Sequence, residues 1–420
     1  MPVTMPWGET LAVTMEIGFT INQFTLDSSL LDSVHVLDGT KEAVPVETFV
    51  QDIQTTRGRS DQLQNFTAGT CTLVLLNNDR RFDPINSASP YWDVSKNQSG
   101  VVPRRKVVVT SGSTIIFSGD ITDVDISYQK GITNISTVDI SVADDFVRLA
   151  NAFTGAAFTP SAELSGARAT RILHLAAVDY SALNRTVSSG VATLGEYEIP
   201  ANSNALTYLQ NCADAEQNFC FMSADGMFTF TDRIANEFAA VVVAFTDTGA
   251  GIGYQELSVV YGQELLYNRV QCTTADADAV VQTQSDTPSQ TAYGISTLVL
   301  DGLLLSTDAA ADALAVVLLE RYKNPVYRFD GMDVILNGLS TVNRNLVVGL
   351  ELGDTISIER TFSTGTPVSV TKMYKVTKIA HKITAGTHTV SFGLAVINIV
   401  YPWTLDDPIF SVLDSSNAYS

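Results

Sequence analysis

The chain has 420 residues, which is enough for about two or three domains that each bury a hydrophobic core. Hydrophobic residues make up 45% of it and charged residues only 17%, with 45 acidic against 25 basic residues. This composition excludes a disordered protein. The net charge of −20 argues against a protein that grips nucleic-acid phosphates or an anionic membrane surface.

Targeting segments and a disulfide framework are not indicated either. No run approaches the ~18 apolar residues of a membrane-spanning helix, and the N-terminus lacks the basic and continuous apolar regions of a signal peptide. The four cysteines form no CxxC pair, so we expect reduced, mostly buried thiols in a protein made in a cytoplasm. A disulfide between Cys212 and Cys220 is the alternative. The other two cysteines are Cys71 and Cys272.

The first block, residues 1–155, is predicted to be β-rich after an irregular start. A strand is expected at 71–76, followed by the loop-forming run NNDRRFDP. A hairpin is expected at 107–117 around Ser111-Gly112-Ser113. Alternation of apolar and polar residues predicts two more strands, near 123–128 and 138–142, joined by Gln129-Lys130-Gly131.

The second block, residues 156–255, changes to an α+β pattern. One helix is expected at 165–177. A second begins at Ser203, a good N-cap, and runs into a hairpin with its turn at 224–226. The predicted buried positions are Ile172, His174 and Leu175 in the first helix, and Leu206, Leu209 and Ala213 in the second.

The third block, residues 256–400, is β-rich again with one inserted helix at about 307–323. Thr307 or Asp308 can cap this helix, and Pro325 ends it. Strands are expected at 334–336, 355–358, 373–383 and 388–396. Residues 401–420 are rich in Asp, Ser and Pro and are expected to form a C-terminal arm.

Two stretches share one pattern. Residues 105–146 and 353–397 both read strand, turn, strand and then a two-stranded hairpin. The identity between them is low, but the shared order suggests two similar small β-barrels in one chain. We therefore predict a β-rich α+β fold with two β-barrels, an inserted α+β region and a short C-terminal arm.

Catalytic motifs are absent from the sequence: it has no P-loop, strand–GxGxxG–helix unit, HExxH or GxSxG. His381 and His388 lie on the predicted C-terminal hairpin and could face each other. A metal site there would still need a carboxylate or a third histidine, so ordinary sheet histidines are the preferred interpretation.

Carboxylates at i,i+2 spacing occur at Asp123/Asp125 and at Asp276/Asp278. In a strand this spacing places both on one face, as a glycosidase or a hard cation needs. Because acidic residues are plentiful, we favour a solvated strand face for both pairs.

The loop-forming run offers a further candidate site. Asn78, Asp79 and Asp83 could line a Ca²⁺ loop, but EF-hand spacing and its terminal Glu are missing, so a turn with Asx side chains is preferred. The basic spots Arg80-Arg81 and 104–106 are interpreted as salt-bridge partners or interface anchors. We therefore predict no catalytic, cofactor-binding or metal-binding residue.

The acidic residues are concentrated in one segment. Residues 201–320 contain 15 Asp or Glu against two Arg, Arg233 and Arg269, and no Lys, which accounts for −13 of the net −20. This charge can serve solubility. Alternatively, the acidic residues line a surface past which a polyanion moves, and their charge prevents the polyanion from binding.

Several motifs in order resemble a known family. The chain reads RGR at 57–59, FTAGTCTLVL at 66–75, NDRRFDP at 78–84 and SPY at 89–91. Further matches are FSGDI at 117–121, DG at 225–226, LYNRV at 266–270, YG at 293–294, RYKNP at 321–325, HKI at 381–383, WTLDDP at 403–408 and VLD at 412–414. This order resembles the minor tail or tail-hub proteins of long-tailed, non-contractile bacteriophages over nearly the whole chain. The first 45 residues have no counterpart in that pattern, and we expect no lytic or fibre-like C-terminal extension of the kind that many larger tail-tip proteins carry.

The resemblance implies a structural virion protein, located at the tail tip and assembled in the bacterial host cytoplasm. Such hubs are trimers in which each subunit gives two tail-tube-like β-barrels, so three subunits offer six. The ring docks on the sixfold tail tube or distal-tail ring and carries a threefold central fibre or spike. The tape measure and other baseplate proteins are implied as partners, and DNA passes through without specific binding.

Two other classes remain as alternatives. A distal-tail adaptor is also β-rich but hexameric, with one tube-like domain. A carbohydrate-binding or depolymerising tail enzyme needs paired carboxylates in an aromatic-lined cleft, and Trp7, Trp92 and Trp403 are scattered along the chain.

Overall fold

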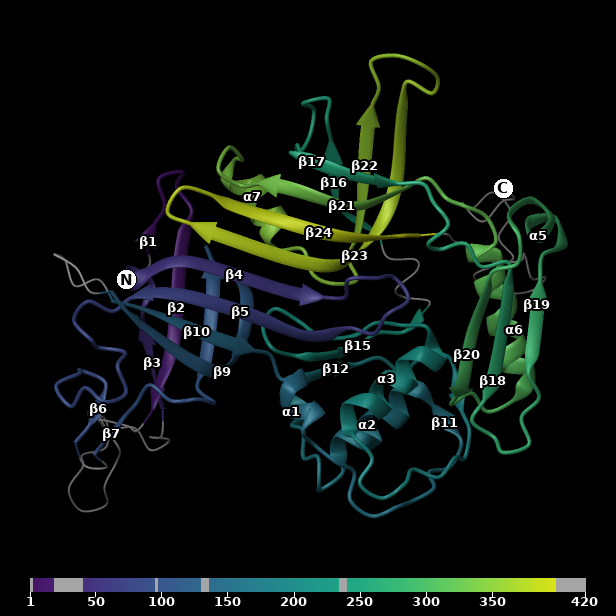
Figure 1. Ribbon diagram of the computed structural model, residues 1–420, viewed down its shortest axis with the longest axis horizontal. Helices are drawn as coiled ribbons and strands as arrows, with labels where there is room; N and C mark the ends of the chain where they lie inside the picture. The colour runs from purple at the N-terminus through teal and green to yellow at the C-terminus, as the bar shows by residue number, and fades with distance from the viewer. Residues whose placement is uncertain (1–2, 19–40, 95–96, 130–135, 234–239, 398–420) are drawn as a thin grey trace.

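The computed structural model describes residues 3–18, 41–94, 97–129, 136–233 and 240–397. The fold is β-rich α+β, and its main feature is one 14-stranded, largely antiparallel sheet. In Figure 1 this sheet occupies the upper and left parts of the molecule, with an α+β region below it and a small helix-covered sheet to the right. Its strands are β1 (Val3–Thr4), β2 (Thr10–Gly18), β3 (Lys41–Pro45), β4 (Val50–Gly58), β5 (Thr67–Leu76), β8 (Lys106–Ser111), β9 (Thr114–Tyr128), β10 (Ser136–Ala143), β16 (Val241–Thr246), β17 (Glu256–Val260), β21 (Arg328–Ile335), β22 (Thr355–Thr361), β23 (Ser369–Thr384) and β24 (His388–Val396).

The large sheet contains one five-stranded unit twice. The first unit has the order β8-β9-β10-β5-β4, and the second has the order β22-β23-β24-β21-β17. Strands occur in equivalent chain order in both units. The long strands β9 and β23 each pair with a short strand through their first half and with the next strand through their second half. The similarity predicted for 105–146 and 353–397 is thus confirmed, and it extends to β4–β5 and β17–β21.

The two units are joined edge to edge, where residues 52–58 of β4 pair with 378–384 of β23. We call this pairing the seam. Because of it, the two units form one continuous sheet, and no closed barrel is found among the described strands. The predicted repeat is therefore present, but its two copies share one sheet and do not form two separate barrels among the described strands.

Most strands predicted from alternation are confirmed, with longer bounds. The hairpin at 107–117 is β8 and β9 around Gly112, whose φ of +60° suits glycine. The predicted strands 114–117 and 123–128 are one strand, β9. Part of the turn after it, from residue 130, lies outside the described residues, as does the arm at 401–420.

The expectation of an irregular start is wrong where the structure describes it. β2 alternates four buried apolar side chains with polar or small ones and pairs with both β3 and β8. The buried residues are Leu11, Val13, Met15 and Ile17. This period of two was visible in the sequence.

The α+β region follows β10. It contains α1 (Phe146–Ala150), β11 (Glu163–Leu164), α2 (Ser165–His174), the short turn of helix Ala182–Asn184, β12 (Arg185–Val187), β13 (Thr193–Leu194), α3 (Ala205–Glu216), β14 (Cys220–Met222) and β15 (Phe228–Phe230). Both predicted helices and the hairpin are confirmed. The N-cap of α3 is Asn204 rather than Ser203, because Asn204 Oδ1 accepts the Thr207 N–H at 3.0 Å. His174 is exposed in the last turn of α2, contrary to its predicted burial, whereas Ile172 is fully buried.

A second insertion lies between β17 and β21. It comprises β18 (Arg269–Thr274), β19 (Gln282–Ser285), α5 (Thr287–Tyr293), β20 (Thr297–Leu303) and α6 (Asp308–Tyr322). α6 is the predicted helix, capped by Thr307, and its apolar side packs on the three-stranded sheet. The remaining elements are the short turn of helix Glu47–Phe49, β6 (Trp92–Asp93), β7 (Gln98–Ser99) and α7 (Thr341–Val348).

Candidate functional site at the junction of the sheet and the α+β region

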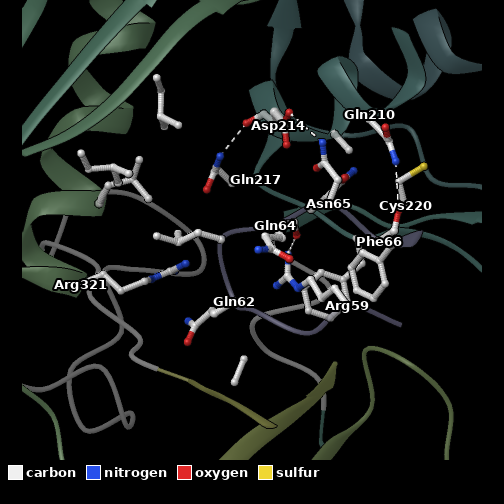
Figure 2. A pocket seen from close by; sticks show the side chains of 18 of the residues that line it. Arg59, Gln62, Gln64, Asn65, Phe66, Gln210, Asp214, Gln217, Cys220 and Arg321 are labelled. Carbon is white, nitrogen blue, oxygen red and sulfur yellow. Dashed lines mark hydrogen bonds between the residues drawn. The ribbon is translucent and has the colours of Figure 1, made fainter. Parts of the chain in front are cut away.

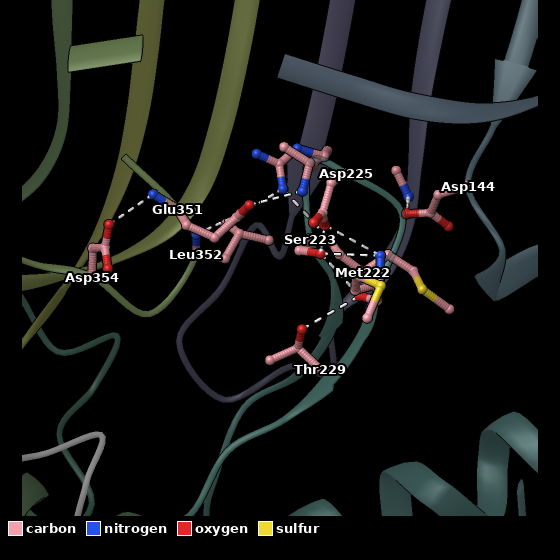
Figure 3. A network of polar contacts seen from close by, with 12 residues as sticks. Asp144, Met222, Ser223, Asp225, Thr229, Glu351, Leu352 and Asp354 are labelled. Atoms are coloured by element: carbon pink, nitrogen blue, oxygen red, sulfur yellow. Dashed lines mark hydrogen bonds and ion pairs between the residues drawn. The ribbon is translucent and has the colours of Figure 1, made fainter. Parts of the chain in front are cut away.

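The seam carries a buried arginine that ties three parts of the chain together. Arg57, on β4, is only 3% exposed, and its Nη1 lies 2.5 Å from Glu351 Oε1. The same nitrogen donates to the Met222 carbonyl at 3.4 Å, and Glu351 Oε2 accepts the Ala224 N–H at 2.7 Å. Arg57 and Glu351 therefore hold the β14–β15 hairpin against both repeated units. Figure 3 shows Glu351 beside Met222 and Ser223 of this hairpin.

Carboxylates around this arginine are bonded to backbone amides. Asp354 Oδ2 accepts the Glu351 N–H at 2.8 Å. At the end of β10, Asp144 accepts the N–H of Gly69 at 2.6 Å and that of Phe146 at 3.0 Å. Burial raises the pKa of Asp144 to about 7, although these bonds and Arg57 act in the opposite direction. This network fixes segments relative to one another, which is a structural role.

A cavity of about 730 Å³ opens beside the junction. Its walls come from the 59–66 loop, α3, β20, α6 and the end of β24. Figure 2 shows Arg59, Gln62 and Arg321 facing the same space, with Asp214 of α3 and Gln217, which follows this helix, on another side. The cavity combines apolar walls with charged groups from several elements, as a binding pocket does.

The two C-terminal histidines meet, as the predicted hairpin allowed. His381 Nδ1 lies 3.0 Å from His388 Nε2, and His388 Nδ1 lies 2.7 Å from Glu9 Oε1. Glu9 thus supplies a carboxylate, but on the side of His388 that faces away from His381. Among the described residues no group of three His, Cys, Asp or Glu side chains is placed to hold a metal ion.

Burial and hydrogen bonding both shift the pKa values of Glu9 and His381. Burial would raise the pKa of Glu9, but hydrogen bonds from His388, Ser111 and Trp7 hold it at about 2. Burial, together with the charges of His388 and Arg57, lowers the pKa of His381 well below its ordinary value. The arrangement therefore favours an ionised Glu9 and a neutral His381.

The aspartate pairs do not form a site. Asp123 and Asp125 are exposed on β9, as the solvated-face interpretation predicts. Asp276 and Asp278 lie in a turn after β18, not in a strand, and Asp276 Oδ1 accepts the Asp278 N–H at 3.0 Å. The strand expected for this second pair is therefore wrong, because an Asx turn forms instead.

In the candidate Ca²⁺ loop, the two aspartates form ion pairs with arginines. Arg80 Nη2 lies 2.7 Å from Asp83 Oδ2, and Arg81 Nη2 lies 2.5 Å from Asp79 Oδ2. Asn78 Oδ1 accepts the Ser136 N–H at 3.0 Å. The interpretation of Arg80 and Arg81 as salt-bridge partners is confirmed. In the run 104–106, the side chains of residues 104 and 106 are exposed at the start of β8.

All four cysteines are free and buried, so the Cys212–Cys220 disulfide is not formed. Burial raises the pKa of each thiol, which makes them unreactive. No helix in the described ranges is long and apolar enough to cross a membrane.

Comparison with solved structures places this fold among tail proteins. A tail protein from Neisseria meningitidis MC58 matches with a TM-score of 0.58 and 11% identity, over 92% of this chain and 96% of that one. The 43 kDa tail protein of prophage MuSo2 from Shewanella oneidensis matches with a TM-score of 0.55 and 10% identity, over 92% and 98%. No family model and no curated protein matches the sequence. At these identities the likeness establishes the fold.

Proposed function

We propose that this chain is a structural phage tail protein, the trimeric hub of a tail tip. In this proposal each subunit contributes two tail-tube-like units, within the divisions 1–155 and 256–400, separated by the α+β region 156–255 and followed by the arm 401–420. The ring joins the sixfold tail tube or distal-tail ring to a threefold central fibre or spike and forms the channel for DNA. It is assembled in the host cytoplasm with the tape measure and other baseplate proteins, and it has no catalytic role.

The observation that carries the proposal is that each end of the repeat has an unpaired strand edge, and that the two edges match the two sides of the seam. At the seam, β4 of the first unit covers the second half of β23. The equivalent half of β9 has β10 on one side and no described strand on the other. β17, the equivalent of β4, pairs only with β21 among the described strands. Unpaired strand edges favour pairing with another chain.

Repetition of the seam between subunits closes a ring. If β17 of one copy covers β9 of the next, every junction in the assembly resembles the β4–β23 seam. Three copies then present six similar units. The contact between neighbouring copies is head-to-tail, as in a cyclic assembly. This agrees with the tail-protein fold of the two similar structures.

The register of the seam predicts which residues meet. Gln54 pairs with Lys382 at the seam. The pairings within each unit make Ser258 the equivalent of Gln54, and Ser127 the equivalent of Lys382. Ser258 of one copy should therefore lie opposite Ser127 of its neighbour. Cα atoms of directly opposed residues are ~4.5–5.5 Å apart, within disulfide range.

Oxidation of the double variant Ser127→Cys/Ser258→Cys tests the interface. We expect a ladder ending at a covalent trimer on non-reducing gels. The matched control Asp125→Cys/Ser258→Cys, displaced by two residues, and each single variant should stay largely uncrosslinked. Absence of crosslinks in purified trimers would refute this interface.

The number of copies of this chain in intact phage particles distinguishes the hub from the distal-tail adaptor. Cryo-EM of the tail tip should show three copies of this chain in a pseudo-sixfold ring. Six copies, each with one tube-like unit on the ring, would favour the hexameric distal-tail adaptor or another baseplate protein.

A further inference from the structure

In the seam, the side chains on the buried face of the two strands are closely packed. Three residues of β4 oppose three of β23 there, Ile53 with Ile383, Thr55 with His381, and Arg57 with Ile379. Each of these six side chains is at most 3% exposed. In the paired seam all six are thus shielded from water.

On the two edges that no described strand covers, the equivalent positions hold apolar or aromatic residues. The pairings that make Ser127 and Ser258 equivalent to Lys382 and Gln54 also fix these positions. They are Val124, Ile126 and Tyr128 on β9, and Leu257, Val259 and Tyr261 on and directly after β17. Neither the arginine nor the histidine of the seam is repeated.

These six side chains are only partly covered in the single chain. Tyr128, Val259 and Tyr261 are 58%, 44% and 67% exposed, and the other three are half-buried. The ring of Tyr128 is held in place, because its hydroxyl donates to Asp83 Oδ2 at 2.6 Å. Apolar side chains exposed along an unpaired strand edge mark a surface for another chain.

We infer that these six residues form the apolar core of the contact between copies of this chain. Ile126 of one copy lies against Val259 of the next, with Tyr128 against Leu257 and Val124 against Tyr261. The inference rests on the pairing of β17 with β9 in the proposed function, and adds the residues that hold the copies together. A second copy fits this surface because apolar residues meet at all three pairs, in the register that the seam shows.

The contact between copies differs chemically from the seam. The seam buries Arg57, paired with Glu351, and His381, whereas the six residues of the contact carry no charge at neutral pH. Salt screens ion pairs but not apolar burial, so association should be at least as strong in about 1 M NaCl as in about 0.15 M NaCl. Weaker association in high salt would contradict an apolar core.

Single lysine substitutions test the surface by sedimentation velocity of the purified chain. We expect Ile126→Lys and Val259→Lys each to weaken association about tenfold or more, because the contact would bury an unpaired charge. Ser127→Lys and Ser258→Lys are the matched controls. They lie next to the tested residues on the same strands, with exposed side chains on the opposite face, and should associate as the unchanged protein does.

The double variant Ile126→Lys/Val259→Glu separates a direct contact from misfolding. Residues 126 and 259 oppose each other across the contact, so the two new charges pair. Association should therefore recover relative to Ile126→Lys or Val259→Glu alone. A variant that had merely unfolded would not be rescued by a second substitution on a distant strand.

The possible outcomes separate this inference from the proposed function. Association unchanged by Ile126→Lys and Val259→Lys would overturn the inference, as would a double variant no better than the single ones. A trimer that persists in both lysine variants would remove this surface and leave the hub intact. Sensitive association into other than three copies would support the surface and contradict the trimeric hub. A chain that stays monomeric at every concentration would also overturn the inference, whereas the copy number in particles would still decide the hub.

Discussion

Gly58 is the residue on which the seam most depends. Its φ is +114°, and a Cβ at this position would lie 2.2 Å from the Thr377 carbonyl oxygen and 2.7 Å from Lys378 Cα. Both neighbours are backbone atoms, so a side chain forces β4 and β23 apart. The close approach of the two units therefore requires glycine at this point.

We expect Gly58→Ala to cost about 2 kcal/mol or more of the free energy of unfolding, because strain and clash add. Gly112→Ala is the matched control. Its φ of +60° is also positive, but the nearest atom to an added Cβ is 3.9 Å away, so about 1 kcal/mol is expected. Thermal unfolding of both variants compares them. Equal losses would contradict the role given to the seam.

His381 makes stability depend on pH. Because its folded pKa is well below that of the unfolded chain, the unfolded state binds the proton first as pH falls. The free energy of unfolding therefore falls as the pH drops below about 6.5, the ordinary pKa of histidine, by at most about 1.4 kcal/mol per pH unit. The lowered pKa of Glu9 adds a further loss between pH 4.5 and about 2.

The variant His381→Gln isolates this effect. Its unfolding free energy should change less between pH 7 and pH 5 than that of the unchanged protein, as measured by urea denaturation at each pH. His174→Gln replaces an exposed histidine and should keep the original pH profile. A steep profile in His381→Gln equal to that of the unchanged protein would refute the assignment.

At the scale of elements, one glutamate joins α3 to its surroundings. Glu216 is fully buried at the end of this helix, and its carboxylate accepts bonds from Ser165 Oγ at 2.8 Å and the Ala192 N–H at 2.7 Å. It also accepts the N–H of Val191 at 3.0 Å and that of Arg233 at 3.3 Å. The carboxylate thus holds α2, the chain before β13 and the end of the hairpin together.

We expect Glu216→Ala to cost about 3 kcal/mol or more, because several buried donors lose their acceptor at once. Glu216→Gln keeps one acceptor oxygen and should cost less. Glu320→Ala, on the exposed side of α6, should stay within about 0.5 kcal/mol. Urea unfolding followed by circular dichroism measures all three. A neutral Glu216→Ala would show that water replaces the carboxylate.

At the scale of the whole molecule, the negative charge predicts how the protein behaves toward DNA. The −13 carried by residues 201–320 leads us to expect no measurable binding of a short duplex, even at ~50 mM salt where phosphate contacts are strong. Replacing Asp276, Asp278 and Asp301, all exposed, by Lys should create salt-sensitive binding in fluorescence anisotropy. Salt-sensitive binding by the unchanged protein would contradict the non-adhesive channel wall that the proposed function requires.

The sequence by itself determined the local elements. Local patterns located β5, β8 to β10 and β21 to β24, and the Thr307 cap with Pro325 bounded α6, because each signal depends on neighbouring residues. The strands β16 to β20 were not predicted. The N-cap of α3 lies one residue later than the predicted Ser203, at Asn204. β2 was not predicted, because the N-terminal segment was interpreted as irregular, although its apolar and polar residues alternate.

Tertiary structure alone decided the seam and the candidate sites. Arg57 and Glu351 are 294 residues apart, and Glu9 and His388 are 379 apart. Arg59 and Arg321 similarly reach one cavity from distant elements. No local pattern marks such partners, because their meeting depends on which strand edges pair. The sequence therefore determined the strands of each repeated unit, while pairing between the units determined the continuous sheet, its junction and its free edges.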